Sequence, residues 1–175
     1  MRTTYPVDVT DCQGRTTTYE QAPERIATFD PTIAETLIEL GLTDKIVGVT
    51  QWGDTDWWPT TEAEMRTLTI INEAPNYPTK EAVVAASPDI VMSIYPSALL
   101  SNDSLPNREQ WADLGVDSYL VKTGCDEVTG ELLDFSSLYE DIRNLGVIFD
   151  VQDRAEELIA RMESDVASLR AEVDA

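Results

Sequence analysis

Histidine is absent from this 175-residue chain, and its absence removes several kinds of chemistry. Ser-His and Cys-His catalytic couples need an imidazole base, and zinc or manganese sites that combine histidine with carboxylates are excluded for the same reason. The sequence also lacks a P-loop and a GxGxxG motif after a strand. The acidic pair Asp54 and Asp56 lacks the remaining spacing of a calcium loop. We therefore expect a protein that is not an enzyme and that holds no metal or cofactor.

Long apolar runs and basic residues are also scarce. No run approaches the roughly 20 apolar residues that a membrane span needs, and the first residues do not have the three regions of an export signal. We therefore expect a soluble chain from which any such signal has been removed. The 12 Lys and Arg residues face 33 Asp and Glu residues, a formal net charge of −21. Such a surface repels phosphate backbones, which excludes nucleic acid as a partner, and suits solubility or a salty habitat.

Cysteine is limited to Cys12 and Cys125, which lie too far apart for a CxxC motif or a zinc-type spacing. Two interpretations stay open. The residues are separate buried thiols, or they form a disulfide in an oxidising compartment, and we keep them as a disulfide candidate.

The stretch from residue 24 to residue 52 predicts a strand–helix–strand unit around which the chain is organised. Residues 26–29 and 46–49 have the composition of buried strands. Thr32 and Glu35 have capping-box spacing, and apolar residues at helical spacing follow as far as Gly41, a residue typical of helix ends. A helix between two strands favours a right-handed parallel crossover, whose carboxyl-end loops face a ligand crevice.

The rest of the chain predicts further elements of the same kind. We expect an N-terminal hairpin from residues 5–11 and 15–19, and a short helical turn at 62–66 before an extended segment at 68–71. Two more helix–strand units follow, with helix caps at Thr79 and at Asn107, where Gln110 completes a capping box and Trp111 and Leu114 face inward. The strands of these units are expected at residues 90–95 and 116–121, and the next helix opens at Asp134.

The last segment, residues 152–175, is a helix pattern without glycine or proline. Its apolar positions form one stripe: Ala155, Leu158, Ile159, Met162, Val166, Leu169 and Val173. At 1.5 Å per residue the helix would be roughly 35 Å long. The stripe has no stop signal, so we expect the polypeptide to continue or the helix to find a partner, self-association included.

Several stretches in this order resemble one family. They are VDVTDCQGRTTTY, APERIATFDPTIAETLIELGLTDKIVGVT, KEAVVAASPDIVMSIY, REQWADLGVDSYLV and SLYEDIRNLGVIFDVQDRAEELIARMESDVASLR. They are similar to the amino-terminal half of ABC-transporter substrate-binding proteins of the helical-backbone class (class III), which bind iron–siderophores, haem and cobalamin. The resemblance implies an α/β fold: a three-layer lobe with a central, mostly parallel sheet, an N-terminal hairpin and a long C-terminal bridging helix. It implies a lobe at 1–150, the start of the interlobe helix at 151–175, and a second lobe that this sequence does not contain.

The resemblance also implies a location and a set of site residues. The protein would be extracytoplasmic, periplasmic or a cell-surface lipoprotein, and would deliver its ligand to an ABC permease. Glu81 matches an acidic residue that docks into the permease, although a carboxylate in the first turn of a helix also stabilises the helix dipole. Ligand contacts would come from the loops after the strands: Asp30, Pro31, Gln51, Trp52, Asn72, Tyr77, Tyr95, Pro96 and Lys122.

The residue types in these loops favour a broad, partly apolar ligand. Rigid aromatic side chains cover such a surface at low entropy cost, although Trp52, Trp57 and Trp58 could instead anchor a long loop to the core, and Tyr95 could simply close it. Cations that would hold an anionic chelate are few, with Lys122 better placed than Arg108.

These features favour a neutral or cationic ferric hydroxamate-type siderophore, with haem and cobalamin behind it. Two alternatives remain at this point. One is a stand-alone flavodoxin-like α/β enzyme, and the other is an interaction module that associates through its last helix.

Overall fold

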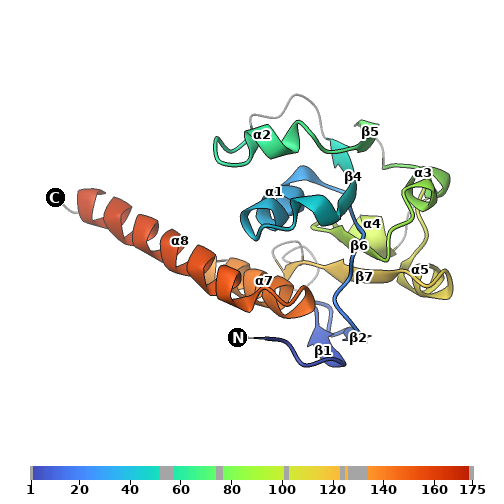
Figure 1. The fold of residues 1–175 in the computed structure, drawn as a ribbon, viewed down its shortest axis with the longest axis horizontal. Coiled ribbons are helices and arrows are strands. Elements are labelled where there is room, and N and C mark those ends of the chain that lie inside the picture. Colours follow the sequence, from blue (N-terminus) through green and yellow to red (C-terminus); the bar gives the residue numbers. More distant parts are fainter. Residues whose placement is uncertain are drawn as a thin grey trace.

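The computed structural model describes residues 2–51, 57–73, 77–100, 103–122, 125 and 134–173. Its strands are β1 (Val7–Thr10), β2 (Thr16–Tyr19), β3 (Ile26–Thr28), β4 (Ile46–Gln51), β5 (Ile70–Glu73), β6 (Ile90–Ser93) and β7 (Asp117–Leu120). Its helices are α1 (Pro31–Glu39), the 3₁₀ turn η1 (Thr43–Lys45), α2 (Glu62–Met65), α3 (Lys80–Ala85), α4 (Pro96–Leu100), α5 (Arg108–Asp113), α7 (Phe135–Ile148) and α8 (Gln152–Val173). Figure 1 shows a sheet with helices on both faces, from which α8 projects.

The central sheet has the order β5-β4-β3-β6-β7, and every neighbouring pair of its strands is parallel. Numbered along the chain, this order is 3-2-1-4-5, whereas the flavodoxin-like order is 2-1-3-4-5. The flavodoxin-like alternative is therefore wrong for the fold. The order reverses between β3 and β6, because the chain first builds the sheet outward through β4 and β5 and then crosses back.

Two apolar layers cover the two faces of this sheet, because successive side chains of a strand point to opposite faces. In β3, Ile26 packs in the layer formed with α1, α2, α7 and α8, whereas Ala27 packs in the layer formed with α3, α4 and α5. In β6, Met92 packs in the layer that contains Ile26, and Val91 packs in the layer that contains Ala27. The predicted three-layer α/β lobe is confirmed.

The start of α1 differs from the prediction. Asp30 is its N-cap and accepts a hydrogen bond from Ile33 N, and Pro31 is the first helical residue. A proline fits that position because its missing N–H would have no helical partner, and the residue before it is held extended. The expected capping box of Thr32 and Glu35 is therefore wrong, and the Glu35 carboxylate bonds elsewhere.

The other predicted helix starts are confirmed. Thr79 caps α3, and Asn107 and Gln110 form a complete capping box at α5. Asp134 caps α7. One inward residue was wrong: Trp111 is fully buried, but Leu114 follows the last turn of α5 and is 47% exposed.

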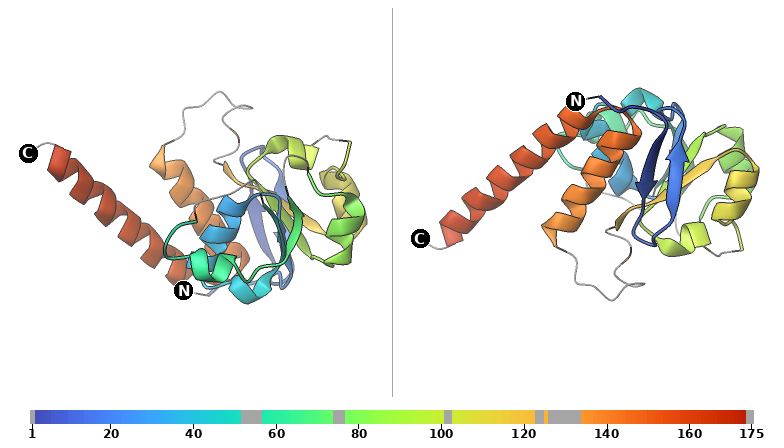
Figure 2. Two further views of the ribbon diagram at one scale, coloured as in Figure 1. Left: turned by 90° about the horizontal axis from the view of Figure 1, so that it is seen from above. Right: turned by 90° about the horizontal axis from the view of Figure 1, so that it is seen from below.

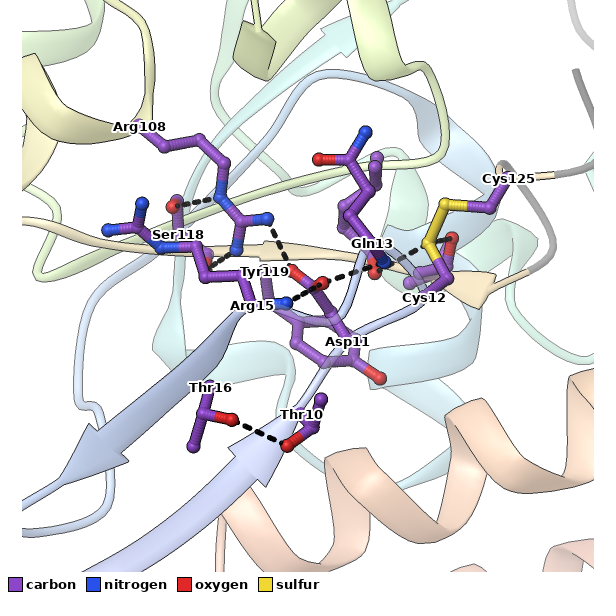
Figure 3. A network of polar contacts seen from close by, with 12 residues as sticks. Thr10, Asp11, Cys12, Gln13, Arg15, Thr16, Arg108, Ser118, Tyr119 and Cys125 are labelled. Atoms are coloured by element: carbon purple, nitrogen blue, oxygen red, sulfur yellow. Dashed lines mark hydrogen bonds and ion pairs between the residues drawn. A yellow bond between two sulfur atoms is a disulfide. The ribbon is translucent and has the colours of Figure 1, made fainter. Parts of the chain in front are cut away.

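The N-terminal hairpin lies beside α7 and β7. Its strands pair antiparallel from Val7 opposite Tyr19 to Thr10 opposite Thr16, as expected. Tyr19 packs in the core layer that also contains Tyr119 of β7. Cys12 in the hairpin turn and Cys125 after β7 form a disulfide, with 6.1 Å between their Cα atoms (Figure 3).

The long helix α8 changes character along its length. Ala155, Leu158 and Ile159 are buried, and Gly146 of α7 allows the close approach, because a Cβ there would lie 2.7 Å from Ala155 Cβ. Further along, Leu169 is 62% exposed and Val173 is 86% exposed. The helix thus packs through its first turns and leaves the lobe through its last (Figures 1 and 2). Among the described helices, none is both long enough and apolar enough to cross a membrane.

Candidate functional site

The candidate site is the edge of the sheet at the carboxyl ends of β3 and β6. In open α/β sheets, ligands bind where the strand order reverses, in the crevice outside these ends. The loop after β3 begins with Phe29 and Asp30, and the loop after β6 begins with Ile94 and Tyr95. Both loops lead directly into helices, so their positions are fixed by α1 and α4.

Asp30 joins the two loops. Its side chain accepts hydrogen bonds from Ile33 N at 3.0 Å and from Ile94 N at 3.1 Å, and the residue is 1% exposed. Burial raises the pKa of Asp30 to about 6, because the charged form is desolvated, while the backbone N–H groups oppose that rise. Asp30 and Pro31 are both buried in this structure, and their contact with a ligand stays a prediction.

Two tyrosines lie near this point. Tyr95 is 43% exposed, and its backbone N–H donates to Ser93 Oγ at 2.9 Å. Partial burial raises the pKa of Tyr95, and the charges of Asp30 and Tyr77 add to the rise, so its phenol stays neutral. Tyr77 Oη shares a hydrogen bond of 2.8 Å with Ser97 Oγ at the start of α4. Tyr95 thus directly follows β6 at the strand-order reversal, whereas Tyr77 precedes α3 and reaches the start of α4 through Ser97. The half-buried Pro96 is the first residue of α4.

Lys122 lies at the carboxyl end of the edge strand β7. Its backbone N–H donates to Asp141 Oδ1 at 2.6 Å, and its Nζ forms an ion pair of 2.5 Å with Glu140 of α7. Asp141 is buried and also accepts from Tyr119 Oη at 3.3 Å. The predicted cation is thus at the edge, and its charge is offset by a neighbouring carboxylate.

The remaining predicted contacts lie toward the other edge strand. Thr50 pairs with Asn72, and Gln51 pairs with Glu73, at the carboxyl ends of β4 and β5. Trp52 lies outside the described residues. The following tryptophans differ, because Trp57 packs against the core whereas Trp58 is 67% exposed. Trp57 thus attaches the segment before α2 to the core, and Trp58 presents its ring to the surface.

Two other residues considered from the sequence lie at the starts of α5 and α3. Arg108 is buried, forms an ion pair with Asp11, and donates to Ser118 O at 2.9 Å and Ser118 Oγ at 3.0 Å (Figure 3). It is therefore a core residue and not a rim cation. Glu81 lies in the first turn of α3 beside a surface groove of about 720 Å³.

Sequence analysis predicted Asp30 but missed Asp141, the second buried carboxylate at this edge. Asp141 was overlooked although it lies on the same helix face as the apolar residues Leu138, Ile142 and Leu145. A charged residue on an apolar face needs a partner, and this was the available signal. Within the described part of the chain, no group of three or more Cys, Asp or Glu side chains could hold a metal ion.

The arrangement suits recognition of a bulky solute. It offers tyrosine phenols, exposed aromatic surface and loops whose backbone positions are fixed by buried hydrogen bonds. Such a surface can cover a partly apolar ligand and orient it through a few polar groups.

Comparison with known proteins agrees with this geometry. The sequence profile of the family described as "Periplasmic binding protein" matches residues 26–175. An uncharacterized ABC transporter substrate-binding lipoprotein, YvrC of Bacillus subtilis, is 25% identical over 166 residues, which are 95% of this chain and 47% of that protein. A cobalamin-binding protein of Halobacterium salinarum is 37% identical over 89 residues, 51% of this chain and 23% of that protein.

Solved structures show the same architecture. The crystal structure of an ABC-type Fe³⁺-hydroxamate transport system from Saccharomonospora viridis superposes with a TM-score of 0.77 and 26% identity, over 94% of this chain and 56% of that chain. The haem-binding protein HmuT superposes with a TM-score of 0.66 and 23% identity, over 99% of this chain and 50% of that one. This chain thus spans about half the length of these structures and less than half of the curated relatives. The chain belongs to the periplasmic binding protein family.

Proposed function

We propose that this chain is the amino-terminal lobe of an extracytoplasmic substrate-binding component of an ABC importer. Residues 1–150 form the lobe, and the helix from residue 151 begins the connection to a second lobe that faces the same ligand. The observation that carries the proposal is the match of residues 26–175 to the periplasmic binding protein family. The strand order agrees with it, because Tyr77 and Tyr95 both follow the carboxyl ends of parallel strands, β5 and β6. The partial coverage of the relatives supports the two-lobe arrangement.

The ligand we propose is a ferric hydroxamate-type siderophore that is neutral or cationic. The relative solved as an Fe³⁺-hydroxamate transport system supports the class. The charge follows from the edge itself: Lys122 is paired with Glu140, and Arg108 is buried against Asp11. An anionic chelate would find little compensating charge among the described residues of this lobe, whereas phenols and aromatic faces suit a neutral one. Haem and cobalamin are the competing ligands.

The proposed contacts on this lobe are the residues at the carboxyl ends of the strands. They are Asp30, Pro31, Gln51, Trp52, Asn72, Tyr77, Tyr95, Pro96 and Lys122. Glu81 would dock the loaded protein onto the permease, a role supported by its exposed position in the first turn of α3.

Titration of tryptophan fluorescence tests this function in a protein that also contains the proposed second lobe, because one lobe supplies only half of the ligand contacts. Quenching by ferrioxamine B, a cationic ferric trihydroxamate, should saturate, and the anionic ferric catecholate enterobactin, haem and cobalamin should bind at least tenfold more weakly, a difference of about 1.4 kcal/mol. Tyr95→Ala should weaken binding by a similar factor because it removes exposed aromatic area at the edge. Leu114→Ala, a matched exposed truncation beyond α5, should not.

Two results would contradict the proposal. Flat titrations with all four ligands would reject the receptor function, and tighter binding of haem or cobalamin would reject the ligand class.

A second candidate function is association through α8, which the exposed Leu169 and Val173 favour. A mass that rises with protein concentration, and that Leu169→Glu abolishes, would support it. Leu158 is unsuitable for this test because it is buried in the lobe.

A further inference from the structure

Two carboxylates one turn apart on α1 hold the segment that leads from β4 into α2. Glu35 Oε1 accepts hydrogen bonds from Trp58 N and from Thr61 Oγ1, each at 2.8 Å. Glu39 Oε1 accepts from Thr60 Oγ1 at 2.6 Å. Residues at this spacing share one face of a helix. Three of the four residues 58–61 are thus hydrogen-bonded to carboxylates of α1.

Glu39 also reaches the long helix. Glu39 Oε2 forms an ion pair with Arg161 of α8, so one side chain contacts both the segment before α2 and α8. Arg154, two turns earlier on α8, donates to Leu40 O and Gly41 O at the end of α1, each at 3.0 Å. In Figures 1 and 2 the segment that leads into α2 lies beside α1, on the side from which α8 projects.

The residue held most directly is an exposed aromatic. The Trp58 ring is 67% exposed, while its backbone N–H is fixed by Glu35. Trp57, its neighbour, packs against the core. A ring that stands out from a fixed backbone loses little freedom when a ligand covers it, which lowers the entropy cost of binding.

We propose that Glu35 and Glu39 are positioning residues that set the place of Trp58 as a ligand contact, and that Glu39 couples this place to α8 through Arg161. The inference rests on the proposed receptor function. It adds Trp58 to the proposed ligand contacts. It also implies that the direction of α8 and the position of the 58–61 segment depend on each other through α1. Neither carboxylate touches the ligand.

The first test separates the hydrogen bonds from the charge. Glu35→Gln keeps an amide oxygen that can accept from Trp58 N and Thr61 Oγ1, whereas Glu35→Ala removes the acceptor. In ligand-free protein, amide exchange at Trp58, followed by NMR, should accelerate about tenfold in Glu35→Ala, as expected for one lost hydrogen bond, and should stay near wild type in Glu35→Gln. Equal exchange in the two variants would overturn the anchoring role.

The second test addresses the coupling. Arg161→Met leaves every contact of the 58–61 segment in place, and Glu39→Gln keeps an acceptor for Thr60 but loses the ion pair. Both should accelerate exchange at Trp58 by about two- to fivefold, the range of a partly exposed ion pair. Arg143→Met, which breaks the exposed pair with Glu156 between α7 and α8, is the matched control and should have no effect there. Unchanged exchange in Arg161→Met and Glu39→Gln would reject the coupling.

Ligand binding completes the experiment and keeps the two proposals distinguishable. In the two-lobe protein, ferrioxamine B should bind about tenfold more weakly to Glu35→Ala and to Trp58→Ala, with Glu35→Gln close to wild type. If wild-type protein binds no ligand of the panel, the receptor function fails, while the exchange data still decide the anchoring. If Trp58→Ala binds as wild type does, the positioning role for ligand binding is wrong although the receptor stands.

Discussion

Two buried aspartates divide the lobe into two differently stabilised regions. Asp11, in the hairpin turn, accepts from Gln13 N at 2.9 Å and Arg15 N at 3.2 Å, and its second oxygen is paired with the buried guanidinium of Arg108 (Figure 3). Asp30, at the ligand edge, is bonded to backbone N–H groups and has a pKa raised to about 6. Both are nearly inaccessible to solvent.

The two buried carboxylates differ in what compensates their negative charge. A buried carboxylate opposite a buried guanidinium fixes three elements together, because Arg108 also binds Ser118 in β7. A buried carboxylate held by dipoles alone can still lose its charge within an ordinary pH range. The hairpin side is thus held by a buried ion pair, whereas the ligand edge contains a carboxyl whose pKa is raised to about 6.

The largest effect should come from removing one partner of the hairpin pair. Arg108→Met leaves Asp11 buried without its cation and should lower the free energy of unfolding by about 3–5 kcal/mol, measured by urea denaturation. The double variant Asp11→Asn with Arg108→Met should recover much of that loss because no uncompensated charge remains. Arg15→Gln, which breaks the exposed pair with Glu109, is the matched control at under about 1 kcal/mol. A loss equal to this control would mean that the pair is not desolvated.

The disulfide stabilises the same region by a different route. It closes a loop of 113 residues, so Cys12→Ser with Cys125→Ser should cost about 2–4 kcal/mol, mainly by freeing the unfolded chain. Denaturation of the wild type with and without a reducing agent measures the effect, and the double variant should not respond to the reductant. A wild-type stability that is insensitive to reduction would contradict this prediction.

The Asp30 side should instead show a pH dependence. Its folded pKa of about 6 lies above the ordinary value of 3.8, so the native state binds the extra proton and stability falls as pH rises from about 4 to about 6. The window corresponds to at most about 3 kcal/mol. Asp30→Asn removes this contribution, so the difference in unfolding free energy between wild type and variant should change across that window. A difference that is constant with pH would show that Asp30 does not titrate there.

Local patterns explain what the sequence could predict. The caps Thr79 and Asn107 were found because each is a short-range signal followed by apolar residues at helical spacing. The start of α1 was misplaced because two cap signals overlap there, and Pro31 at the first helical position decides for Asp30. Leu114 was assigned inward by periodicity alone, although the helix had already ended.

The site was harder to predict because its contacts join residues that are distant in sequence. Nothing near Arg108 shows that its partner is Asp11 or that the pair is buried, so its position could not be separated from that of a rim cation. Glu35 matched a capping pattern, yet it binds Trp58 on another segment. Periodicity places a side chain on a face, and only the fold determines what lies opposite.

The smallest effect on stability should accompany a change in ligand preference. Glu140→Gln removes the exposed partner of Lys122 and should alter the free energy of unfolding by less than about 1 kcal/mol. Lys122 would then lose the negative charge of one neighbouring carboxylate beside the ligand edge, so the anionic ferric catecholate should bind about two- to fivefold more tightly, with the gain lost at high salt. Glu62→Gln, which breaks the exposed pair with Arg66 in α2, should leave this affinity unchanged. Because backbone hydrogen bonding to Asp141 holds Lys122 in either case, an unaltered preference would place its charge outside the reach of the ligand.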